Sequence, residues 1–169
     1  MNSNQEKFRY LFYWVIIFVV AGSMIIYGLS KPIQFQSFKD STNLNVSEGH
    51  KLMWTFYSYS LIYPIIIGVF EVLGGILLLF NRTRVLGCIL LTIILSNIIL
   101  QDYIYEITAL NSAIYYQILI LILLVFDHKK IKNTINEILR SEKRNRNLTL
   151  MIVAFVIAIA LKYFETKII

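Results

Sequence analysis

The chain has 169 residues, of which 57% are hydrophobic and only 15% charged, so it has too few polar groups to coat a water-soluble globule. Its formal net charge is +6, but the basic residues lie in short polar stretches between long apolar runs, which argues against a nucleic-acid partner. The lone Cys88 excludes an intrachain disulfide, a paired-thiol redox centre and a Cys-based metal site. We therefore expect an all-α integral membrane bundle, forming a single membrane domain over residues 1–169.

Five apolar runs predict five transmembrane helices. The first run crosses a hydrocarbon layer of roughly 30 Å at about 1.5 Å per residue, and it is too long for the h-region of a signal peptide, so we interpret it as an uncleaved helix. Pro64 predicts a kink near the start of the second helix. In chain order, the expected helices cover approximately residues 10–29, 57–80, 85–103, 110–126 and 148–164.

The polar connections differ in length and charge. The stretch from Lys31 to Lys51 is expected to be a loop or an interfacial segment. Only residues 81–84 separate the second and third helices, which predicts a tight antiparallel hairpin. The basic cytoplasmic loop 127–147 has two interpretations: an amphipathic helix on an anionic leaflet, or a solvated extension of the fourth helix.

Basic residues predict the orientation, because they accumulate on the cytoplasmic side of short loops. The N-terminal segment, the 81–84 hairpin and the 127–147 loop carry most of them. We therefore expect the N-terminus to be cytoplasmic and the C-terminus to be outside.

Glu71 is the sharpest candidate for a functional residue. At the helical rise it lies about 14 Å into the membrane, where a carboxyl group is costly. It is interpreted either as a proton-accepting or ligand-binding group, or as a protonated acid that donates a hydrogen bond to Asn97. Gly68, Gly74 and Gly75 flank it, and small residues of this kind allow close helix packing.

Polar and aromatic side chains are predicted to gather at the outer end of the bundle. There Lys31 is expected to pair with Asp102 or Glu106. An aromatic belt is favoured over a headgroup or quinone pocket, because Tyr is enriched at membrane interfaces. No metal is expected, since His50 and His128 lie on opposite sides of the membrane. The gathered residues are Tyr27, Lys31, Tyr57, Tyr59, Tyr63, Gln101, Asp102, Tyr103, Tyr105, Glu106, Tyr115, Tyr116 and Gln117.

Several segments together resemble the DoxX-like family of small bacterial membrane proteins, over about helices one to four. They are YGLSK at 27–31, WTFYSYS at 54–60, GVFEVLGG at 68–75 and LFNRTRVLG at 79–87. The resemblance implies a four-helix membrane bundle, with the fifth helix as an addition to it, in the cytoplasmic (inner) membrane of a bacterium. Residues 101–107 keep the Tyr-acid pair of the family pattern but lack its Pro and Lys.

The resemblance implies a link to membrane oxidoreductase systems. We therefore expect a noncatalytic subunit or accessory of a membrane redox system. The alternative is a small transporter or a quinone- or lipid-binding protein that uses Glu71. An enzyme acting alone is not expected, because the sequence contains no catalytic constellation. No cofactor is evident, and a quinone is the one candidate. Membrane lipids are the expected partners, with a redox protein and a second copy of the chain as further candidates.

Overall fold

The computed structural model describes residues 3–36, 45–139 and 147–168, and all secondary structure in these ranges is helical. Contacts divide the chain into two compact units, Met1–Lys132 and Asn133–Ile169, and each is described here by itself. A single domain over residues 1–169 therefore stays a prediction. The helices are α1 (Ser3–Gln36), α2 (Glu48–Tyr59), α3 (Ile62–Leu79), α4 (Arg84–Ile104), α5 (Leu110–Phe126), α6 (His128–Leu139) and α7 (Leu148–Ile168).

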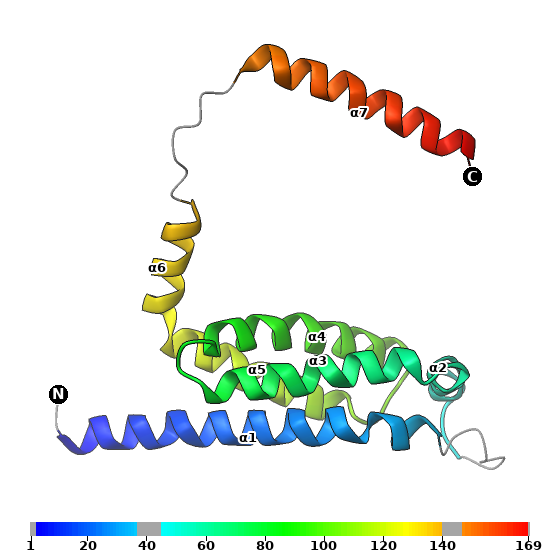
Figure 1. Cartoon of the computed structure of the whole chain (residues 1–169). Helices are drawn as coiled ribbons and strands as arrows, with labels where there is room; N and C mark the ends of the chain where they lie inside the picture. The colour runs from blue at the N-terminus through cyan, green and yellow to red at the C-terminus, as the bar shows by residue number, and fades with distance from the viewer. Residues whose placement is uncertain (1–2, 37–44, 140–146, 169) are drawn as a thin grey trace. The chain divides into compact units, whose positions relative to one another are not determined.

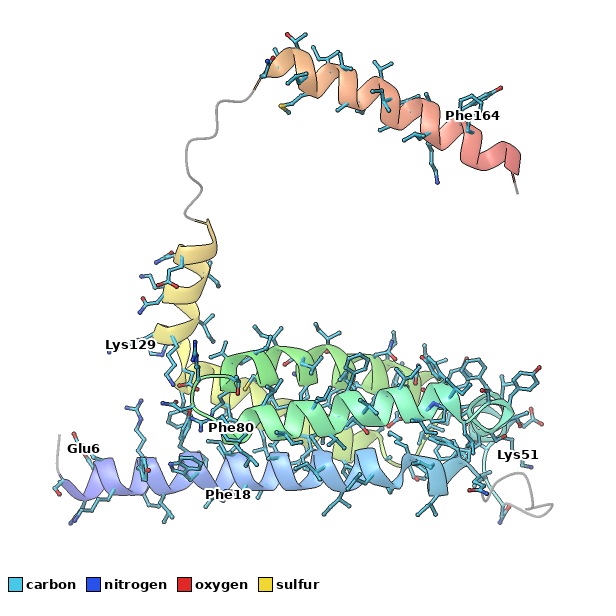
Figure 2. All side chains as sticks on the ribbon, in the orientation of Figure 1. Glu6, Phe18, Lys51, Phe80, Lys129 and Phe164 are labelled. Atoms are coloured by element: carbon cyan, nitrogen blue, oxygen red, sulfur yellow. The ribbon has the colours of Figure 1, made fainter. Side chains whose placement is uncertain are left out.

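The first unit is built around four helices that lie alongside one another (Figure 1). Helix α1 packs on α3, α3 on α4, and α4 on α5, which returns to α1. We call one end of this bundle the α2 end, where α2 contacts α1, and the other the hairpin end, where α3 turns into α4. Figure 2 labels Lys51 at the α2 end and Phe80 at the hairpin end. The larger buried apolar cluster comprises Ile16, Ile17, Val20, Ala21, Met24, Leu78, Cys88, Leu91, Leu95, Ile120 and Leu123, and a smaller one at the α2 end comprises Phe35, Met53, Tyr57 and Ile107.

The outer surface of this bundle is apolar along its length. Phe18 on α1, Val69 on α3 and Ile93 on α4 are more than half exposed, and such a surface suits lipid rather than water. Among the described residues, α1, α3 and α4 are each long and apolar enough to cross a membrane. Helix α5 and the start of α6 count as a fourth span if the bent pair is taken as one. These helices indicate a membrane protein.

The second apolar run forms two helices instead of one kinked helix over 57–80, so that prediction was wrong. Helix α2 ends at Tyr59, and Ser60 is extended with φ −142° and ψ 119°. Helix α3 then begins at Ile62. Pro64 causes no kink because it occupies the first turn of α3, where a backbone N–H has no acceptor within the helix. The chain therefore breaks before the proline.

The polar stretch between the first two spans is partly helical. Helix α1 continues through Pro32 to Gln36, beyond the expected end near residue 29. Before α2, the Ser47 side chain accepts a hydrogen bond from the His50 backbone N–H at 3.2 Å, which satisfies a donor at the start of the helix. Both ends of the 31–51 stretch are therefore helical: residues 31–36 belong to α1, and residues 48–51 belong to α2.

The turn after α4 contains a residue in the left-handed backbone conformation. Glu106 has φ 53°, and the Ile107 N–H donates to the Asp102 carbonyl oxygen at 2.8 Å. This is the Schellman ending of a helix, and its left-handed position usually holds glycine. Glu106 is exposed, whereas Ile107 is buried. The turn therefore carries backbone strain at Glu106.

Replacing this residue by glycine is expected to stabilise the protein. Glu106→Gly removes the clash between Cβ and the backbone and should raise the free energy of unfolding by about 1 kcal/mol. Unfolding of the purified protein in detergent would measure the change. Glu106→Ala is the control, because alanine removes the carboxyl group but keeps Cβ. An equal gain in both variants would show that charge, not backbone strain, is the cause.

The second unit holds the end of α6 and all of α7. Helix α6 is separate from α5, which ends at Phe126 with Asp127 as its C-cap. A helix is therefore present in the basic loop, while its contact with a leaflet stays a prediction. The described side chains of α7 up to Phe164 are exposed. Its apolar part, Leu148–Phe164, is shorter than the three spans above. A fifth transmembrane helix therefore also stays a prediction.

Candidate functional site: a buried ion pair and cavity at the α2 end

Two glycines bring α1 and α3 into backbone contact. A Cβ added at Gly28 would collide with the Gly68 carbonyl oxygen, and one added at Gly68 would collide with the Gly28 carbonyl oxygen. Pro32 has no N–H with which to bond the Gly28 carbonyl four residues earlier, and this carbonyl faces Gly68. Gly75 continues the contact, since its added Cβ would lie 2.9 Å from the Ala21 carbonyl oxygen.

This close approach positions an ion pair. Lys31 follows Gly28 by three residues and Glu71 follows Gly68 by three, so each charged residue lies one turn from its glycine. The Lys31 Nζ lies 3.4 Å from Glu71 Oε1, and the side chains are 14% and 3% exposed. The second oxygen, Glu71 Oε2, is buried and has no hydrogen-bond partner among the residues that the structure describes.

The close ion pair therefore differs from the predicted ones, although Lys31 also interacts electrostatically with Asp102. Lys31 was expected to pair with Asp102 or Glu106, and Glu71 with Asn97. The glycine contact favours the observed pair, because it brings α1 against α3 at the level of both charges. Glu106 is exposed in the turn after α4.

Asn97 belongs to a different hydrogen-bonded chain. The Tyr57 hydroxyl donates to Gln101 Oε1 at 2.6 Å, and Gln101 Nε2 donates to Asn97 Oδ1 at 2.9 Å. Burial of the Tyr57 ring raises the pKa of its hydroxyl to about 12, since burial disfavours the phenolate. Tyr57 is therefore a neutral donor near pH 7, and the chain ties α2 to α4.

A cavity of about 160 Å³ lies between the five helices at this end. Its polar residues include both members of the ion pair and Asp102, which is 4% exposed. Most of the remaining wall is apolar, and a cavity of about this size holds one aromatic ring. The lining residues are Met24, Tyr27, Lys31, Gln34, Phe35, Met53, Trp54, Tyr57, Ile67, Glu71, Leu95, Ile98, Gln101, Asp102, Ile107, Ala109, Ser112, Ala113 and Tyr116.

The tyrosines expected at the outer end divide into two groups. Tyr27, Tyr57 and Tyr116 line the cavity, whereas Tyr59 and Tyr103 are 86% and 72% exposed. Exposed tyrosines of this kind suit an interfacial belt. The exposed tyrosines fit the belt interpretation, while a headgroup or quinone pocket stays a prediction.

The predicted packing glycines contact two different helices. Gly68 and Gly75 face α1, as described above. Gly74 faces α4 instead, where an added Cβ would lie 2.5 Å from the Leu91 side chain. On α4, a Cβ added at Gly87 would lie 3.0 Å from the Gly74 carbonyl oxygen. The three predicted positions therefore hold α3 against both of its neighbours.

The hairpin end contains a buried cluster that sequence reasoning missed. Arg84 is 2% exposed; its Nε donates to the Leu78 carbonyl oxygen at 2.8 Å and its Nη1 to the Tyr13 hydroxyl at 2.9 Å. The Tyr13 hydroxyl donates to Asp127 Oδ2 at 2.7 Å. The cluster joins α1, the hairpin and the end of α5. Tyr13, Arg84 and Asp127 are too far apart in sequence for any local pattern to signal their contacts.

Comparison with known proteins identifies a relative. No family model matches the chain, and no solved structure matches it. The uncharacterised protein YwoB of Bacillus subtilis (strain 168) is 33% identical over 113 residues, which cover 66% of this chain and 73% of YwoB. The chain belongs to the YwoB family. Since YwoB is itself uncharacterised, membership in the YwoB family carries no activity, ligand or partner over to this chain.

Proposed function

We propose that this chain is a membrane protein that binds a quinone head group in the cavity at the α2 end. The observation that carries the proposal is the Lys31–Glu71 ion pair, which lines an otherwise largely apolar cavity together with a second buried acid, Asp102. Apolar pockets with a few convergent polar groups are the usual form of small-molecule sites.

A purely structural role accounts less well for this arrangement. A structural ion pair in a core normally has its remaining hydrogen-bonding atoms satisfied by the protein. Here Glu71 Oε2 has no hydrogen-bond partner within the described part of the chain, and both charged side chains line the cavity. Intramembrane acids of this kind are functional candidates by default. A molecule bound in the cavity would contact the Lys31 side chain, which is 14% exposed.

The walls favour a flat ring. Phe35 stacks on Tyr57 with ring centroids 4.7 Å apart, and Phe35 also contacts Trp54 at 5.1 Å. Aromatic side chains pack well against other aromatic groups, and a ligand dissolved in the bilayer would reach the bundle from lipid. The DoxX-like resemblance, with its link to redox systems, points to a quinone among such ligands.

The wider setting follows from the same resemblance. In this proposal, α1, α3, α4 and α5 form the DoxX-like four-helix core and α7 adds a fifth transmembrane helix. The protein lies in the inner membrane of a bacterium with its N-terminus cytoplasmic, which the basic residues of the hairpin and the 127–147 loop support. It serves a membrane redox system as a noncatalytic accessory. The alternative is a small transporter that releases its ligand when Glu71 changes protonation.

Copurification tests the proposal. Wild type, Glu71→Gln and Glu106→Gln would be purified in mild detergent, and bound quinones and proteins quantified by mass spectrometry. Glu106→Gln is the matched control, since it makes the same change at an exposed residue of the same end. We expect quinone in wild type and in the control, and at least tenfold less in Glu71→Gln. Equal amounts of quinone in all three proteins would show that the cavity is not the quinone site. Copurification of a redox protein without any quinone would support the accessory role alone.

A further inference from the structure

A polar groove of about 380 Å³ lies at the hairpin end of the bundle, opposite the cavity at the α2 end. The start of α1, the hairpin, and the junction of α5 with α6 all contribute to it. Its polar side chains are those of Glu6, Arg9, Asn81, Asp127 and Lys130, and all five residues belong to the first unit of the chain. The groove is therefore at the end that the basic residues predict to meet the cytoplasmic membrane surface.

An apolar groove of about 420 Å³ adjoins the polar one along α5. Its wall includes Ile118, Leu121 and Val125, which are 51%, 47% and 71% exposed. Arg9 and Phe126 line both grooves, so the polar hollow continues into the apolar one. A phospholipid has the same two parts, because its head group lies at the membrane surface and its acyl chains lie in the hydrocarbon layer.

Arg9 is the cation best placed to hold a head group. Its guanidinium carbon lies 5.3 Å from the centroid of the Phe126 ring, a cation–π contact where the two grooves meet. Lys130 is engaged differently, because its ammonium group lies 3.4 Å from Asp127 Oδ1 and donates to Asn81. Arg9 belongs to neither of the two ion pairs in the described part of the chain. Its guanidinium group can therefore bind a phosphate, whose oxygens match the fork of N–H donors.

The surrounding charges favour an anionic head group. Asp127 is already paired with Lys130 and accepts a hydrogen bond from the Tyr13 hydroxyl at 2.7 Å, which leaves Glu6 as the acid that opposes a phosphate. Within residues 3–16, 80–86 and 126–132, six exposed lysines and arginines outnumber these two acids. Such an excess of positive charge attracts anionic lipids. The six are Lys7, Arg9, Arg82, Lys129, Lys130 and Lys132.

We propose that the two grooves together bind one anionic phospholipid, with its phosphate group on Arg9 and an acyl chain in the apolar groove along α5. Lys130 adds positive charge beside the phosphate. Basic pockets between transmembrane helices bind the head groups of anionic lipids in this way. A lipid held here joins the start of α1 to the end of α5. The site is separate from the cavity at the α2 end, so its test is independent of the proposed function.

Native mass spectrometry of the delipidated full chain in detergent tests the site without any mutation. The protein would be titrated with phosphatidylglycerol and with phosphatidylcholine of the same acyl chains, which both carry a phosphate but differ in net charge. We expect the Kd of the first phosphatidylglycerol to be about fivefold lower, the effect of one cation near the membrane surface. Equal Kd values would overturn the proposal. Inorganic phosphate should not displace the lipid, and full displacement would assign the polar groove to a free anion instead.

Substitutions in each groove then locate the lipid. Arg9→Gln should raise the Kd for phosphatidylglycerol about fivefold, whereas Arg9→Lys should keep part of the preference, because lysine retains the charge without the fork. Glu6→Gln should tighten binding, since it removes the opposing acid. Val125→Asn should weaken both lipids by placing an amide in the apolar groove. Lys51→Gln, at an exposed position of the α2 end, is the matched control and should behave as wild type. Equal losses in Arg9→Gln and Lys51→Gln would show a diffuse effect of charge and overturn the site.

Discussion

Gly28→Ala and Gly68→Ala are each expected to lower the free energy of unfolding by about 3 kcal/mol, the upper part of the usual range for overpacking. In each case the added methyl group meets a backbone carbonyl oxygen of the opposite helix. A backbone atom cannot move aside as the end of a flexible side chain can. Helices α1 and α3 must therefore separate, and the Lys31–Glu71 distance must increase with them.

Gly22→Ala is the matched control for these two substitutions. Gly22 lies on the same helix as Gly28, but an added Cβ there meets no atom within 4 Å. Its alanine variant should be as stable as wild type or gain up to about 1 kcal/mol from helix propensity. Chemical unfolding of all three variants in one detergent gives the comparison. Equal effects at Gly22 and Gly68 would show that the glycine contact does not determine stability.

Lys31→Met is expected to lower the free energy of unfolding by about 3 to 4 kcal/mol, because it leaves Glu71 buried without its cation. Methionine keeps the aliphatic part of the side chain, so packing against Gly68 is retained. The double variant Lys31→Met/Glu71→Leu should recover most of the loss, since it removes both charges and fills the space with apolar atoms. Unfolding in detergent would measure both.

Lys51→Met is the control for loss of a positive charge at the same end of the bundle. Lys51 is exposed, and substitutions at exposed positions usually change stability by less than about 0.5 kcal/mol. If the double variant is no more stable than Lys31→Met, the loss comes from the lysine's packing and not from an unpaired Glu71. If Lys31→Met matches wild type, the ion pair contributes nothing to folding.

Helix positions in the bundle were largely predictable from sequence. The expected ranges 85–103 and 110–126 correspond to α4, Arg84–Ile104, and α5, Leu110–Phe126. Long apolar runs bounded by polar residues determine such helices locally, so no distant contact is needed to find them. The break at Ser60 was missed because residues 53–80 read as one continuous apolar stretch.

The polar residues of the candidate site were predictable from the sequence, but which of them contact one another was not. Glu71 was selected as an acid inside a membrane span, and Lys31 and Asp102 were placed together at the outer end of the bundle. Which of them meet depends on how closely each pair of helices approaches. Arg84 illustrates the same limit: the sequence placed it only as a basic residue of the short hairpin, and the structure buries it against Tyr13.

The sequence by itself determined the class of this protein, because its apolar composition and five long apolar runs leave a bilayer as the only suitable solvent. It also marked the glycines and the acid on α3, since their types and spacing are local features. Only the tertiary structure decided that Gly28 meets Gly68, that Lys31 therefore reaches Glu71, and that a cavity lies beside the pair. The reason is physical: these contacts join residues about forty positions apart, and the backbone approach that permits them belongs to two helices together.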